Sequence, residues 1–193
     1  MLKKIAPVQS IVTTMAIAIF SLAITACSGI EKRETASETA MNPVENRLRK
    51  LEDLEEIRRL LMDYGRFLDR RDFESFSLLF AENDGEWIGG MGRARGQKAI
   101  RRLMEETIGT NAGEDSPGNF HLFTNDRIDL NGDRAAAETK WIFMVRSAGG
   151  KPEPFYLGHY EDELVREKGE WKFLRRVVFS DIPADNPESV RTE

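Results

Sequence analysis

The chain has 193 residues, of which 32% are charged and 40% hydrophobic, and its formal net charge is −5 at pH 7. This acidic balance argues against nonspecific binding of nucleic acids, which requires a surplus of basic residues. Because Cys27 is the single cysteine, the chain can form neither an intrachain disulfide nor a cysteine-based metal site.

The first 26 residues have the order of a secretory signal. Lys3 and Lys4 precede an apolar run from Met15 to Ala23, and small residues lead to Cys27. A basic start, an apolar stretch and a cleavage point after small residues are typical of signal peptides. The four residues that end at Cys27 resemble a bacterial lipobox, in which the cysteine carries lipid as the first residue of the mature chain. The alternatives are an ordinary signal peptide and an uncleaved membrane anchor.

Residues 27–42 predict a lipidated cysteine followed by a flexible tether, since they hold few large apolar side chains and cannot bury enough surface to fold. We expect one folded domain at residues 43–183 and a C-terminal tail at residues 184–193. The lipoprotein resemblance, with Ser28 after the cysteine, implies a lipid anchor in the bacterial cell envelope. It also favours the outer membrane, with the domain facing the periplasm.

Three helices are predicted in the first half of the domain. Apolar residues that recur every three or four positions predict a long first helix, namely Leu48, Leu51, Leu54, Ile57, Leu61, Tyr64 and Leu68. Asn42 as a cap, with Pro43 and Glu45 in the first turn, marks its start. A second, short helix carries Phe73, Phe76, Leu79 and Phe80, and a third follows Gly96 with Ile100, Leu103, Met104 and Ile108 inward.

In the second half of the domain, apolar and polar residues alternate with a period of two. It predicts four strands, at about Phe120–Leu130, Arg134–Arg146, Phe155–Arg166 and Trp171–Ile182. Turn formers such as Asn131-Gly132 join them, and residues 85–92 predict a short hairpin or bent strand. Helices followed by an antiparallel meander indicate the α+β class, with a curved antiparallel sheet wrapped around the N-terminal helices.

Three segments carry a resemblance to a known family. They are Tyr64–Phe73, Phe120-His121-Leu122 with the Asn131-Gly132 turn after it, and Gly158-His159-Tyr160. These segments resemble the SnoaL-like branch of the nuclear transport factor 2-like superfamily, and the resemblance spans about Leu48 to Pro183. It implies a cone with an apolar pocket at its open end. Since the fold hosts enzymes, carriers and assembly domains, it does not by itself give the function.

Within that superfamily, the chain is similar to scytalone dehydratase and bile-acid 7α-dehydratase. Tyr64 and Asp69 match the tyrosine and aspartate of the bile-acid enzyme, and His121 matches a pocket histidine that both enzymes carry. The chain departs from both at Val145, which stands where they have a second polar group. Arg176 lies near the place of a late arginine of the bile-acid enzyme.

The resemblance implies a catalytic set of Tyr64, Asp69 and His121. Removing water from a β-hydroxy carbonyl compound requires a base for the α-proton and an acid for the departing hydroxyl, and a histidine can be both near neutral pH. Asp69 would orient that histidine, and Tyr64 would hold a carbonyl or enolate oxygen. The alternatives are that Asp69 caps a turn or pairs with an arginine, and that Tyr64 and His121 are hydrogen-bonded core residues.

Four further residues are candidates for ligand binding. Trp141, Phe143 and Val145 share one strand face and predict either a pocket wall or plain core. Arg176 is a candidate ligand clamp, with a solvated charge at the sheet edge as the alternative. No spacing demands a metal site, although His121, His159 and Asp69 could meet, and we expect neither a metal nor a cofactor.

Two function classes follow from the sequence. The first is a cofactor-free lyase or isomerase that acts on a small, apolar, hydroxylated substrate. The second is a noncatalytic carrier or interaction domain held at the membrane. The expected partners are a small apolar molecule in the pocket and the membrane through lipid on Cys27, with no nucleic acid. A homodimer and a homotrimer are the oligomeric alternatives.

Overall fold

The computed structural model describes residues 42–110 and 118–184. The predicted signal, Cys27 and the tether up to residue 41 lie outside the described residues, and so do residues 185–193 of the predicted tail. Within the described part, no helix combines the length and the apolar character needed to cross a membrane.

The first helix, α1 (Pro43–Arg70), begins where the sequence predicts. The Asn42 side chain caps it by accepting a hydrogen bond from the Val44 backbone N–H at 3.0 Å. The predicted apolar stripe is buried only in the second half of the helix. Ile57 and Leu61 are buried, whereas Leu48 and Leu51 are 54% and 64% exposed. The first turns of α1 therefore contribute little to the core.

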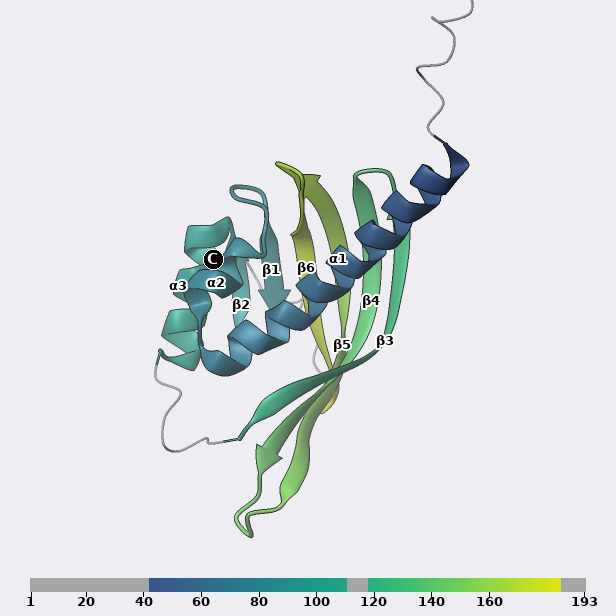
Figure 1. Cartoon of the computed structure of the whole chain (residues 1–193). Helices are drawn as coiled ribbons and strands as arrows, with labels where there is room; N and C mark the ends of the chain where they lie inside the picture. Colours follow the sequence, from purple (N-terminus) through teal and green to yellow (C-terminus); the bar gives the residue numbers. More distant parts are fainter. Residues whose placement is uncertain (1–41, 111–117, 185–193) are drawn as a thin grey trace, which may run out of the picture. The chain divides into compact units, whose positions relative to one another are not determined.

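The remaining elements follow the predicted order closely. They are α2 (Phe73–Leu78), β1 (Glu86–Gly89), β2 (Gly92–Arg95), α3 (Gln97–Ile108), β3 (Phe120–Asn131), β4 (Arg134–Arg146), β5 (Pro152–Glu167) and β6 (Glu170–Ile182). Residues 85–92 were predicted as a short hairpin or a bent strand, and β1 and β2 form a hairpin that extends three residues further, over residues 86–95. Helix α1 runs obliquely across one face of a curved, unclosed sheet, while α2 and α3 lie beside β1 and β2 (Figure 1).

The sheet has the strand order β2-β1-β6-β5-β4-β3. The antiparallel meander from β3 to β6 confirms the predicted arrangement. One pairing departs from a purely antiparallel sheet, because β1 runs parallel to β6 and the sheet is therefore mixed. The chain leaves α2 alongside β6, where Phe80 already bridges Phe173 in the parallel sense. Parallel neighbours need a long connection, and here most of the domain lies between them.

A β-bulge in β6 decides which residues face the helices. Leu164 pairs with Phe173 and Glu163 pairs with Arg175, so Leu174 is an extra residue without a partner of its own. An extra residue shifts the alternation of a strand by one position. Before the bulge, Trp171 and Phe173 are the buried residues. After it, Arg176, Val178 and Ser180 turn to the concave face, up to a second register shift at Asp181.

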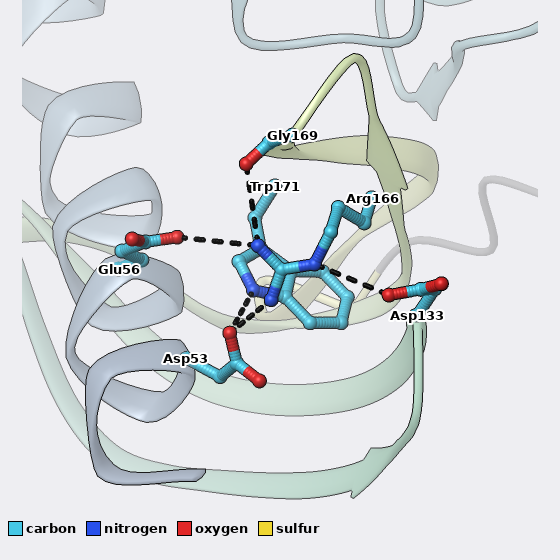
Figure 2. A network of polar contacts seen from close by, with 6 residues as sticks. All are labelled: Asp53, Glu56, Asp133, Arg166, Gly169 and Trp171. Carbon is cyan, nitrogen blue, oxygen red and sulfur yellow. Dashed lines mark hydrogen bonds and ion pairs between the residues drawn. The ribbon is translucent and has the colours of Figure 1, made fainter. Parts of the chain in front are cut away.

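A network around Arg166 fastens α1 to one end of the sheet (Figure 2). The guanidinium pairs with Asp53 of α1 and donates to Asp133 Oδ1 and the Gly169 carbonyl, each at 3.2 Å. It also lies 4.7 Å from the centre of the Trp171 ring, whose Nε1 donates to Asp53 Oδ1 at 3.3 Å. These contacts join α1 to the β3–β4 and β5–β6 turns, and the cavities described next do not include them.

Candidate functional site

A cavity of about 440 Å³ lies on the concave side of the sheet and is lined mainly by aromatic rings. We call it the aromatic cavity. Its aromatic walls are Tyr64, Trp87, His121, Trp141, Phe143, Tyr156 and Tyr160, and the other lining residues are Leu68, Gly90, Met91, Val178 and Ser180. None of these described lining residues is an Asp, Glu, Lys or Arg. The cavity is therefore suited to an uncharged, apolar group.

His121 and Asp69 form a close pair at the edge of this cavity. His121 Nδ1 lies 2.6 Å from Asp69 Oδ1. The backbone N–H of His121 also donates to the same carboxylate, at 3.0 Å to Oδ2 and 3.2 Å to Oδ1. The end of α1 supplies Asp69 and the start of β3 supplies His121. Because the carboxylate occupies Nδ1, Nε2 is the ring nitrogen left for a ligand.

Tyr64 lines the aromatic cavity together with His121. Its hydroxyl oxygen accepts a hydrogen bond of 2.9 Å from Trp87 Nε1, which leaves the phenolic O–H free to donate. Burial raises the pKa of Tyr64, while the positive charge of Arg176 acts in the opposite direction. Tyr64 is therefore held as a neutral hydrogen-bond donor, which is the form needed to bind a carbonyl oxygen.

Arg176 lies beneath the cavity and does not line it. The structure buries its side chain fully, with Nε and Nη2 donating to the two carboxylate oxygens of Asp162 at 2.7 Å each. The guanidinium carbon lies 4.0 Å from the ring centre of Tyr64 and 4.1 Å from that of Tyr160. The alternative of a solvated charge at the sheet edge was wrong, because the bulge at Leu174 turns Arg176 inward, and the predicted ligand clamp is not among the residues that line the cavity.

This buried pair was missed by reasoning from the sequence, although one signal was present. Asp162 occupies the same phase of β5 as Tyr160 and Leu164, both of which are buried. An acid in the inward phase of a strand requires a buried cation or donor. Nothing in the sequence marks Leu174 as an extra residue, so the partner of Asp162 could not be identified.

The other predicted ligand-binding residues divide into two groups. Trp141 and Phe143 both line the aromatic cavity. Val145 lies farther along β4, where it pairs with Glu153 near the end of the strand, and it is not among the residues that line the described cavities.

A second cavity, of about 420 Å³, adjoins the first. We call it the Arg71 cavity. It shares Leu68, Met91, His121 and Phe143 with the aromatic cavity, and its own lining residues are Asp69, Arg71, Ile108 and Asn119. His121 thus stands between an aromatic compartment and a more polar one.

His159 forms a similar pair on another part of the sheet. Its Nδ1 lies 2.7 Å from Asp181 Oδ1, and its ring stacks on Phe179. It lines neither the aromatic nor the Arg71 cavity. Among residues 42–110 and 118–184, no cluster of three or more His, Cys, Asp or Glu side chains could hold a metal ion.

Comparison with known proteins shows where this architecture belongs. An NTF2-like protein with a cystatin-like fold from Novosphingobium aromaticivorans superposes with a TM-score of 0.67 at 25% identity, over 81% of this chain and 99% of that one. A protein of the same organism assigned as a scytalone dehydratase has a TM-score of 0.58 at 27% identity, over 75% and 97% of the two chains.

Sequence comparison gives a relative and a family. An uncharacterized protein of Mycobacterium tuberculosis is 26% identical over 132 residues, which are 66% of this chain and 84% of that protein. The family of SnoaL-like domains matches residues 49–177, a segment that runs from α1 into β6. With this match over most of its length, the chain belongs to the family of SnoaL-like domains.

Proposed function

We propose that this protein is a cofactor-free lyase or isomerase of the dehydratase type, which acts on a small, apolar, hydroxylated molecule. The observation that carries the proposal is the contact of 2.6 Å between His121 Nδ1 and Asp69 Oδ1 at the wall of the aromatic cavity. A carboxylate at Nδ1 fixes the ring orientation and stabilises the imidazolium that forms during proton transfer. The neighbour assigned as a scytalone dehydratase supports the same class of reaction.

The chemistry assigned to these residues is the elimination of water from a β-hydroxy carbonyl compound. His121 Nε2 takes the α-proton, and the electrons of the broken C–H bond form the double bond as the C–O bond breaks. The protonated imidazole then gives its proton to the departing hydroxyl, which leaves as water. Tyr64 donates to the carbonyl oxygen, where negative charge develops, and Trp87 holds the tyrosine hydroxyl in place.

The test uses aryl β-hydroxy ketones, whose dehydration gives conjugated enones that absorb in the ultraviolet. His121→Ala and Asp69→Asn should each lower kcat/KM by roughly 10²–10⁴-fold, the range for loss of general acid–base catalysis. The double variant should be little worse than either single one, because residues that act as a unit are not additive. His159→Ala is the matched control, since it removes a histidine paired with an aspartate outside both cavities. Turnover that survives the loss of His121 would refute the dehydratase mechanism.

A noncatalytic carrier is the second candidate. The observation in its favour is the aromatic cavity itself, whose rings can bind an apolar molecule without any reaction. This reading gains support if the ketones bind tightly and are released unchanged, and if mass spectrometry finds an apolar molecule that co-purifies with the protein.

The proposal also includes a lipid anchor at Cys27 that holds the domain at the bacterial envelope, on the outer membrane and facing the periplasm. It is supported by the order of Lys3, Lys4, the apolar run and the small residues before Cys27. An anchored dehydratase would meet its apolar substrate close to a lipid surface, where such molecules accumulate.

A further inference from the structure

Arg71 brings a positive charge to the cavity that adjoins the aromatic one. It follows the last residue of α1 and has a left-handed backbone conformation, with φ of 56°. Its Nη1 donates to the carbonyl oxygens of Ile108 and Gly109, the latter at 2.8 Å, at the end of α3. These two bonds fix the guanidinium at the wall of the Arg71 cavity.

The guanidinium retains donors that these carbonyls do not use. An arginine has five N–H donors, and Nη1 carries two of them. Among the described residues, neither Nε nor Nη2 of Arg71 makes a hydrogen bond or an ion pair, and no carboxylate pairs with Arg71. Asp69, the acid that shares the cavity, is engaged by His121. The Nε and Nη2 edge is the pair of parallel N–H groups that matches a carboxylate.

The two adjoining cavities fit a single ligand whose two ends differ in chemistry. They share His121 and Phe143, so a molecule that fills both passes the histidine. The aromatic cavity is lined by rings and by no Asp, Glu, Lys or Arg among the described residues, whereas the Arg71 cavity contains an arginine whose Nε and Nη2 have no hydrogen-bond partner within residues 42–110 and 118–184. An apolar ring system therefore fits the first cavity, and an anion fits the second.

We propose that the substrate is a carboxylic acid with an apolar ring body, and that Arg71 binds its carboxylate while the rings occupy the aromatic cavity. This inference rests on the proposed function in one respect only. It places the reacting carbons beside His121, between the carboxylate and the rings of the substrate. The carboxylate is a handle remote from the reaction, and its binding does not require turnover.

The experiment measures binding of naphthyl-substituted acids, from naphthylacetate to naphthylbutyrate, and of the corresponding primary amides, to the full-length protein. Trp87 and Trp141 line the aromatic cavity, so quenching of tryptophan fluorescence reports the Kd. We expect wild type to prefer the acid over the amide by roughly tenfold or more at the best chain length. Arg71→Gln should abolish this preference by weakening the acid alone, and Arg71→Lys should keep part of it.

Arg70→Gln is the matched control. It removes the same charge one residue away, at an exposed position that lines neither described cavity, and should leave the preference unchanged. Unaltered binding of the amides by Arg71→Gln shows that this variant is folded. Equal affinity of wild type for acid and amide, no binding of the acids, or an equal loss for both ligands in Arg71→Gln would each overturn the proposal and leave Arg71 as a cap of two helix ends.

The same assay separates this inference from the proposed reaction. Asp69→Asn and His121→Ala should retain the preference for the acid, because neither residue binds the carboxylate. If the preference depends on Arg71 but no acid or ketone is ever dehydrated, the carboxylate site stands and the proposed catalysis fails. If the ketones are dehydrated but the acids are not preferred, the catalysis stands and the carboxylate site fails.

Discussion

Because Gly158 has no side chain, it allows the wall of the aromatic cavity to pack closely against it. A Cβ at this position would lie 2.0 Å from the Phe179 carbonyl oxygen and 2.6 Å from the Trp141 ring. The indole of Trp141, which lines the cavity, thus rests directly on the backbone of β5. A larger residue would have to displace both the ring and a backbone carbonyl of β6.

Gly158→Ala should therefore lower the free energy of unfolding by about 1–3 kcal/mol, the usual cost of overpacking. Gly149→Ala is the control, because a Cβ there meets no atom within 4 Å, and its effect should lie between none and about 1 kcal/mol of stabilisation. Urea denaturation of both variants measures the difference. Equal midpoints would mean that the ring and the carbonyl can move away without cost.

At the scale of elements, β5 and β6 are joined across the concave face by a fully buried ion pair. Arg176 and Asp162 are both buried, with two hydrogen bonds of 2.7 Å between them. The desolvation of two charges offsets much of their attraction. The pair therefore contributes little net stability, but removing either residue alone leaves the other charge buried without a counter-charge.

Arg176→Met should lower the free energy of unfolding by about 3–5 kcal/mol, because it leaves Asp162 buried without a counter-charge. Arg176→Met combined with Asp162→Leu should recover most of that loss, since no charge then remains in the core. As a control, Lys168→Ala breaks an exposed pair with Glu82 and should cost less than about 1 kcal/mol. Denaturant midpoints of the variants test this, and a double variant no more stable than Arg176→Met would contradict it.

The helices and strands were easier to predict from the sequence than which of their side chains face the core. The stripe on α1 and the alternation in β3 to β6 are periodic, so the sequence predicted these elements almost to their ends. Asp69 and His121 were predicted as a pair through family resemblance, and the structure brings them into contact. The inward position of Arg176 depends on one unpaired residue, Leu174, and such a bulge leaves no periodic signal. Arg71 was not singled out from the sequence, because the end of α3 that it contacts is distant along the chain.

At the scale of the whole molecule, the α+β class was predictable because helical and strand periods occupy separate halves of the domain. The parallel pairing of β1 with β6 was not, since it joins residues 86–88 to residues 175–177 and the intervening chain gives no local indication. The membrane anchor remains a prediction from residues before the described domain. It places the point of attachment, Cys27, before the first described residue, Asn42.

Cys27→Ser should therefore release the protein from the membrane fraction without changing the stability of the domain. Metabolic labelling with a fatty-acid analogue should mark wild type and not the variant. Thermal unfolding of the two purified proteins should give the same midpoint, because Cys27 lies outside the described fold. Equal labelling of wild type and Cys27→Ser would show that the lipid, if present, is attached elsewhere.

The extra residue at Leu174 has a consequence for how relatives of this chain are aligned. A relative without the bulge must present its concave residues one position earlier along the last strand. If no gap is opened at position 174, each cavity residue beyond it is aligned with a residue of the relative that faces the opposite side. In this chain, deletion of Leu174 would close the bulge and leave Arg175 opposite Glu163 and Arg176 opposite Asp162, as they are now. Val178 and Ser180 would likewise keep their β5 partners and their places in the aromatic cavity. An ungapped alignment would thus misassign the site residues of the last strand, whereas a single gap at position 174 restores them.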